Sequence, residues 1–156
     1  QRQMCIRDSY YSGRYYELLA HSGNIPLIRH LSTGIVNRCE QQIKVYEPNS
    51  LTLKEWMHYL TVIESELIVQ FYKTINAEQY RAIMIDALTI LRMKKEELHM
   101  QQQKASLFLE RMFETGIGAI ELQKQIELRK QSLRQHLNDI SLNEVSMQYI
   151  EQYCLS

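Results

Sequence analysis

Hydrophobic residues recur every three or four positions along most of this chain, which is the spacing of one face of an α-helix. A first apolar stripe begins just after Pro26 and runs to Ile43, and a second runs from Leu53 to Ile75. No segment alternates apolar and polar residues over a convincing length, as a half-buried β-strand does. The pattern predicts an all-α fold, an antiparallel helical bundle of four to six helices.

Residues that begin or end helices stand between these stripes. Pro26 suits the first turn of a helix, where its missing N–H has no intrahelical role. Thr52 and Glu55 form a capping box, in which each side chain accepts a hydrogen bond from a free backbone N–H. Asn76, followed by Gln79, resembles a further cap. We therefore expect one helix to begin at Thr52 and a break in the helical pattern at Asn76.

The longest stretch without glycine or proline covers residues 77–114. Ten of its positions follow a heptad spacing, with Lys94 and Gln101 as polar exceptions. These positions are Tyr80, Met84, Ala87, Leu91, Lys94, Leu98, Gln101, Ala105, Phe108 and Met112. A Gly-Ile-Gly turn at 116–118 precedes another apolar stripe. The pattern predicts a long helical hairpin with arms at about 77–114 and 119–138.

The first nine residues do not belong to this picture. Residues 4–8 read Met-Cys-Ile-Arg-Asp, which back-translates to the end of a transposase adapter used in sequencing libraries, and residues 1–3 fit the same reading frame. Segments of this kind are excluded from fold reasoning. We expect residues 1–9 to be a translated sequencing adapter, not native and disordered. Residues 10–156 are expected to form a single helical domain or an N-terminally truncated fragment.

Charge and composition narrow the class of partner. Lysine plus arginine and aspartate plus glutamate both total 18, so the formal net charge is zero. This balance argues against a strongly basic surface for nucleic acid. No apolar run approaches the roughly 18 residues of a membrane span. The sequence predicts a cytoplasmic protein that has a protein partner, or associates with itself, through the helical hairpin.

Two Glu-x-x-His motifs have a spacing suited to metal binding. Glu55 and His58 form one pair, and Glu96 and His99 form the other. Residues i and i+3 share a helix face, so two such pairs resemble part of the di-metal site of ferritin-like bundles. Glu55 already has a capping role, and Glu96 belongs to a run of charges typical of a solvated face. A ferritin-like di-metal carboxylate bundle is therefore kept only as an alternative, and no metal site is assigned.

A second alternative comes from residues 14–45. A short helix, a turn at Gly23 and a following helix resemble a helix-turn-helix fragment of a DNA-binding transcriptional regulator. Residues 10–47 contain four basic and three acidic side chains, which is a weak electrostatic footprint for DNA. An ordinary helical hairpin is the preferred interpretation.

The chain shows no glycine-rich phosphate loop and no recognisable nucleophile–base arrangement. The sequence therefore predicts no catalytic residue, no cofactor and no cofactor-binding residue. The heptad pattern of the hairpin favours a non-enzymatic helical scaffold or protein-protein interaction module as the function.

Overall fold

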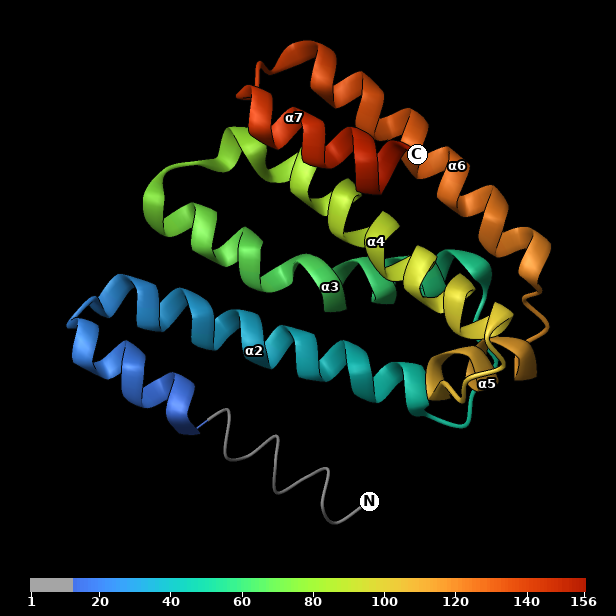
Figure 1. Cartoon of the computed structure of the whole chain (residues 1–156). Helices are drawn as coiled ribbons and strands as arrows, with labels where there is room; N and C mark the ends of the chain where they lie inside the picture. The colour runs from blue at the N-terminus through green and yellow to red at the C-terminus, as the bar shows by residue number, and fades with distance from the viewer. Residues whose placement is uncertain (1–12) are drawn as a thin grey trace.

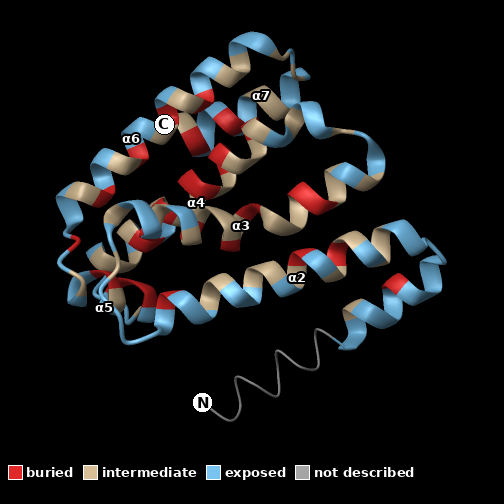
Figure 2. Cartoon of the chain, turned by 180° about the vertical axis from the view of Figure 1, so that it is seen from behind, coloured by how far each residue is buried: buried red, intermediate tan, exposed pale blue. Residues whose placement is uncertain are grey.

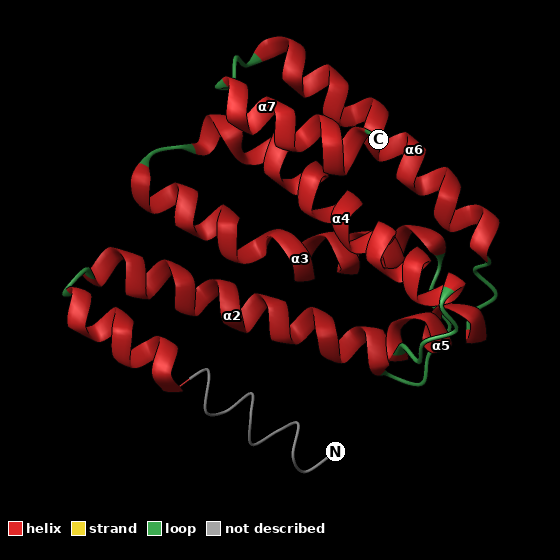
Figure 3. Ribbon diagram, viewed as in Figure 1, coloured by secondary structure: helices red, strands yellow, loops and turns green. Residues whose placement is uncertain are grey.

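The computed structural model describes residues 13–156, which fold into helices joined by short loops (Figure 1, Figure 3). Residues 13–156 contain no strand, and the prediction of an all-α bundle is confirmed. The predicted adapter segment lies outside the described residues. A first helix covers residues 13–22. The later elements are α2 (Ile25–Tyr46), α3 (Leu53–Ile75), η1 (Glu78–Tyr80), α4 (Arg81–Gln101), α5 (Leu107–Glu114), α6 (Ala119–Asp139), α7 (Glu144–Ile150) and η2 (Glu151–Leu155).

The long helices pack in the order α2, α3, α4, α6, each running opposite to its neighbour (Figure 1). Helix α4 is central because α3 and α6 pack on it from different sides. Helix α7 and the η2 turn lie beside α4 and close the bundle near the end of the chain. In the part of the chain that the structure describes, no helix combines the length and the apolar character that crossing a membrane requires.

The helix boundaries follow the predicted local signals. Asn24 caps α2, since its side chain accepts a hydrogen bond from the Leu27 amide at 3.0 Å. The capping box of α3 is confirmed: the Glu55 amide donates to Thr52 Oγ1, and the Thr52 amide donates to a Glu55 carboxylate oxygen. Asn76 ends α3 in the left-handed conformation, with φ of 53°. This conformation is tolerated by asparagine more readily than by most residues.

The predicted hairpin needs one correction. Its second arm is confirmed as α6, but residues 77–114 do not form one helix. Helix α4 ends at Gln101, and Gln103 takes a left-handed φ of 51°. Ser106 then caps α5, accepting a hydrogen bond from the Leu109 amide. Because of this break, the described residues contain seven helices, more than the predicted four to six.

The break at residues 102–106 places α5 against α3 and completes the larger of two buried clusters. The Phe108 ring packs edge-on against Trp56, with centroids 4.9 Å apart, and Trp56 Nε1 donates to Thr115 Oγ1 at 2.8 Å. The cluster comprises Val45, Trp56, Leu60, Ile63, Met93, Phe108, Leu109, Met112, Ile117, Leu122 and Ile126. Burying each large apolar side chain stabilises the fold by about 1.5–3 kcal/mol.

A smaller cluster lies where α4, α6 and α7 meet. It comprises Ile83, Ala87, Ile90, Leu133, Ile150 and Cys154. Figure 2 shows buried segments where the helices face one another and exposed stretches along the outer sides of α2 and α6. The two clusters fix α4 between its neighbours along its whole length.

Candidate functional site

A groove of about 830 Å³ opens between α4 and α7. Its walls come from the end of α3, the η1 turn, α4, the loop before α7, and α7 with η2. It is lined by Tyr72, Tyr80, Ile83, Met84, Ala87, Leu88, Leu91, Ser141, Leu142, Asn143, Val145, Ser146, Tyr149, Ile150 and Cys154. None of these side chains carries a formal charge at neutral pH. We call this site the uncharged groove.

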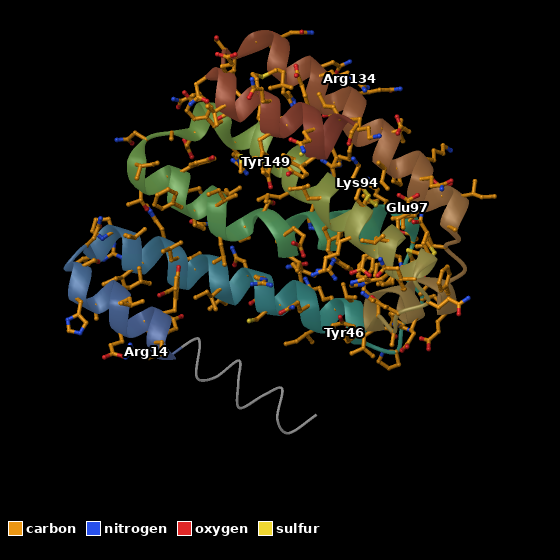
Figure 4. All side chains as sticks on the ribbon, viewed as in Figure 1. Arg14, Tyr46, Lys94, Glu97, Arg134 and Tyr149 are labelled. Atoms are coloured by element: carbon orange, nitrogen blue, oxygen red, sulfur yellow. The ribbon has the colours of Figure 1, made fainter. Side chains whose placement is uncertain are left out.

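Helical spacing explains why α4 contributes so much of this groove. Tyr80, Met84, Ala87 and Leu91 are the first four positions of the predicted heptad pattern, and all four line the groove. Residues at this spacing share one face of a helix. The other wall comes from α7, where Figure 4 shows Tyr149 on the helix that lies against α4.

The floor of the uncharged groove is firmly packed. Ile83 is 1% exposed, and Cys154 is fully buried with its Sγ 4.0 Å from the Ala87 carbonyl oxygen. Burial raises the pKa of the Cys154 thiol, although the nearby Lys94 ammonium acts in the opposite direction. The thiol is therefore protonated near neutral pH and contributes an apolar surface to the groove.

One end of the groove is formed by two tyrosines. The rings of Tyr72 and Tyr80 lie 6.4 Å apart, centroid to centroid. Burial raises the pKa of Tyr72, and the nearby Tyr80 raises it further. The Tyr72 phenol therefore stays neutral at physiological pH and adds no charge to this end of the groove.

A buried polar network lies on the other side of α4. Asp86 is 2% exposed and accepts three hydrogen-bond contacts from α6: Arg129 Nη1 at 2.9 Å, Ser132 Oγ at 2.7 Å and His136 Nδ1 at 2.9 Å. Arg129 Nη2 also donates to Thr61 Oγ1 of α3 at 3.0 Å. A buried carboxylate is tolerated when its oxygens have partners of this kind. The network joins α3, α4 and α6.

The structure brings together only part of the predicted metal-binding set. Glu96 is buried; its Oε1 accepts a hydrogen bond from Arg92 Nε, and its Oε2 accepts one from Ser106 Oγ. His99 Nδ1 lies 3.7 Å from the same Oε2. Glu55 caps α3, and His58 is exposed on the same helix. Within residues 13–156 no group of three or more His, Cys, Asp or Glu side chains is arranged to hold a metal ion.

The segment considered for DNA binding is an ordinary helical hairpin in the structure. Helix α2 directs polar side chains toward α3: His30 Nδ1 lies 2.8 Å from Thr74 Oγ1, and Asn37 donates to Glu66 at 2.9 Å. A recognition helix needs such groups free for bases and phosphates. Here they join α2 to α3.

Two features of the site were missed from sequence. The wall formed by residues 141–154 carries no motif that indicates ligand binding, and the Asp86–Arg129 pair joins residues 43 positions apart. A buried aspartate within the apolar stretch before Leu91 was the one available signal. It interrupts a hydrophobic run and therefore needs a partner from elsewhere in the fold.

Comparison with known proteins relates the chain to a family of synthase subunits. A family model described as "Heptaprenyl diphosphate synthase (HEPPP synthase) subunit 1" matches residues 2–143. The curated protein "Heptaprenyl diphosphate synthase component 1" of Geobacillus stearothermophilus is 31% identical over 102 residues, which are 65% of this chain and 46% of the relative. The chain thus spans about half the length of this relative. No solved structure matches the chain. The family match includes residues 2–9, whose adapter origin stays a prediction.

These matches correct the function predicted from the sequence. A family of synthase subunits is neither a generic non-enzymatic scaffold nor a DNA-binding regulator, and it is not a ferritin-like di-metal bundle. The error has a physical reason. The predictions relied on local motifs, whereas the groove combines α4 with residues 141–154, which begin 40 positions after the end of α4.

Proposed function

The chain belongs to the family of heptaprenyl diphosphate synthase subunit 1, and we propose that it acts as one subunit of a polyprenyl diphosphate synthase. The words "subunit 1" and "component 1" in the two matching descriptions support a second chain as its partner. This narrows the protein partner predicted from the sequence to another component of the synthase.

The uncharged groove is the structural observation that best supports this proposal. A polyprenyl chain is a hydrocarbon, and moving it out of water is favourable by roughly 25 cal/mol for each Å² of apolar surface that becomes buried. The groove volume of about 830 Å³ lies within the range of about 300–1,000 Å³ that is typical of sites for small molecules. We assign the groove to the polyprenyl part of the substrate or product.

The lining suits this ligand in two further ways. No charged side chain has to lose its water when a hydrocarbon enters, which removes a cost of several kcal/mol for each charge. Tyr72, Tyr80 and Tyr149 provide aromatic rings with a polar end, which suit the boundary between a hydrocarbon and water.

Reconstitution tests the subunit role. The full chain would be co-expressed with the second component of a heptaprenyl diphosphate synthase, and complex formation would be measured by size-exclusion chromatography with light scattering. We expect a stable complex that lengthens an allylic diphosphate with isopentenyl diphosphate, while neither chain alone reaches that rate. Absence of a complex together with an unchanged rate for the second component would refute the proposal.

A matched pair of variants tests the groove. Leu88→Glu adds a charge to the groove wall, whereas Leu98→Glu adds the same charge to α4 at a side chain that is 48% exposed and outside the groove. We expect Leu88→Glu to shorten the products or slow elongation on the order of tenfold, with Leu98→Glu close to the parent chain. If Leu88→Glu prevented complex formation and left polyprenyl binding intact, the groove would be a protein contact, contrary to the assignment.

A further inference from the structure

A second, smaller groove of about 470 Å³ lies between the first half of α3 and the middle of α6. Three of its seven lining residues are basic: Lys54 and His58 on α3, and Arg129 on α6. None of the lining residues is acidic. In a chain with zero formal net charge, this concentration of one sign sets the site apart, and we call it the basic groove.

Helical spacing places the polar side chains of α3 and α6 along the same groove. Lys54 and His58 are four residues apart on α3, and Gln125 and Arg129 are four residues apart on α6, so each pair shares a helix face. All four line the groove. Two turns of each helix therefore present hydrogen-bond donors from opposite walls.

Arg129 is positioned before any ligand arrives. Its guanidinium donates to Asp86 at 2.9 Å and to Thr61 at 3.0 Å, and its side chain is 28% exposed. Two of its five N–H groups are used in this way, which leaves others for a ligand in the groove. An arginine fixed by its neighbours loses little conformational entropy on binding, and its planar fork matches the oxygens of a phosphate.

The charge balance of the groove favours an anion. Asp86 offsets the charge of Arg129, so Lys54 provides the uncompensated positive charge, with His58 adding to it when protonated. Neither Lys54 nor His58 forms an ion pair with any other residue in the described range. Two carboxylates on the same helices have other partners: Glu55 of α3 accepts from Thr52, and Glu121 of α6 accepts from Gln125. Both Lys54 and His58 are exposed, so a ligand can reach them from solvent.

We propose that the basic groove binds a diphosphate group. The choice of diphosphate over other small anions rests on the proposed function, since a polyprenyl diphosphate synthase handles this group in its substrates and products. The groove itself points only to an anion that accepts several hydrogen bonds, because its donors are an ammonium, an imidazole, an amide and a guanidinium. Leu53 and Met57 add apolar surface beside these donors, which suits a short prenyl group attached to the diphosphate.

Titration of the full chain with inorganic diphosphate tests the proposal. Binding would be followed by calorimetry and by the histidine and arginine side-chain signals in NMR spectra at physiological salt. We expect saturable binding that weakens on the order of tenfold in the double variant Lys54→Gln/His58→Gln. The matched control is Lys124→Gln, which removes a charge from an exposed position of α6 outside the groove and is expected to leave binding within about twofold.

Titration with isopentenyl diphosphate distinguishes two sources of the diphosphate group, a prenyl diphosphate and free diphosphate. Isopentenyl diphosphate that binds more tightly than inorganic diphosphate, with the gain lost in Met57→Ser, identifies a prenyl diphosphate as the ligand. Equal affinity for both identifies the free diphosphate released by the reaction. Arg129→Lys keeps the charge but removes the planar fork, and weaker binding in a folded Arg129→Lys chain supports a bidentate contact.

The proposal is overturned if inorganic and isopentenyl diphosphate both fail to saturate the chain at millimolar concentration. It is also overturned if Lys124→Gln weakens binding as much as the double variant, because binding would then follow overall charge. Either result leaves the subunit role standing if the reconstituted complex is active. An inactive complex combined with diphosphate binding at the groove would refute the proposed function and retain the anion site.

Discussion

The uncharged groove and the basic groove are linked through two adjacent residues of α4 but are built from opposite chemistry. Ala87 lines the uncharged groove, and the neighbouring Asp86 holds the Arg129 side chain that lines the basic groove. One groove excludes charge along its whole lining, and the other gathers three basic side chains. Helix α4 thus separates a site suited to a hydrocarbon from a site suited to an anion.

The two grooves also differ in what holds them open. The uncharged groove rests on apolar packing, in which the loss of one side chain is partly absorbed by its neighbours. The basic groove depends on a buried charged network, in which the loss of one partner leaves another charge unpaired. This difference predicts that the basic side of α4 is the more sensitive to substitution.

The largest expected effect is therefore at Asp86. Asp86→Ala removes the carboxylate that pairs with Arg129 and accepts from Ser132, and it leaves a partly buried guanidinium without its charge partner. We expect the free energy of unfolding to fall by about 3–5 kcal/mol, measured by urea denaturation of the full chain. Asp139→Ala, at an exposed position of α6, is the control and should stay within about 0.5 kcal/mol. A loss below about 1 kcal/mol for Asp86→Ala would show that the network contributes little.

The next effect is expected in the floor of the uncharged groove. Ile83→Ala removes a side chain that is 1% exposed, and we expect a loss of about 2–3 kcal/mol in the same assay, because an open groove lets the wall relax in part. Ile120→Ala removes the same atoms from a side chain that is 85% exposed and should change stability by less than about 0.5 kcal/mol. Equal losses at Ile83 and Asp86 would remove the contrast between the two sides of α4.

The same contrast explains which parts of the structure were predictable from sequence. The capping box at Thr52 and the stop at Asn76 depend on neighbouring residues, and both were predicted. The α4 wall of the uncharged groove follows from helical periodicity, so its residues were already grouped in the heptad pattern. Local chemistry was sufficient for each of these features.

The remaining features depend on contacts that a linear sequence does not show. The pairing of Asp86 with Arg129 spans 43 residues, and the basic groove joins α3 to α6. The break near Gln103 was missed because no glycine or proline marks it, although Ser106 is a good capping residue. His58 was considered as a metal ligand because of Glu55, whereas the basic groove gives it other neighbours.

A smaller effect is expected in the rates at which a thiol reagent modifies the two cysteines of the described residues. Cys154 is buried in the floor of the uncharged groove with a raised pKa, and Cys39 is exposed on α2. In a Cys5→Ser chain, we expect a thiol reagent to modify Cys154 at least about tenfold more slowly than Cys39, because the thiolate is the reactive form and the site must first open. Mass spectrometry of the labelled chain measures both rates.

Ligands sharpen this labelling experiment. A polyprenyl ligand in the uncharged groove should slow the labelling of Cys154 further, whereas inorganic diphosphate should leave it unchanged. Labelling of Cys39 serves as the internal control in each case. Similar protection of Cys154 by both ligands would contradict the separation of the two grooves.

The smallest expected effect concerns the stability at alkaline pH, and it also distinguishes the grooves. The pKa of Tyr72 is raised by burial and by the neighbouring Tyr80, so the folded state favours the neutral phenol. A raised pKa means that this contribution to stability is fully present below the unfolded pKa of about 10 and is lost as the pH rises through the higher folded value. Tyr72→Phe cannot ionise, so its stability should fall less steeply above about pH 10 than that of the parent chain. Urea denaturation across this pH range measures how steeply the stability of each chain falls. A polyprenyl ligand should raise the Tyr72 pKa further, because it removes water from the phenol. An identical slope in the two chains would place Tyr72 in contact with water and weaken its role as the end wall of the uncharged groove.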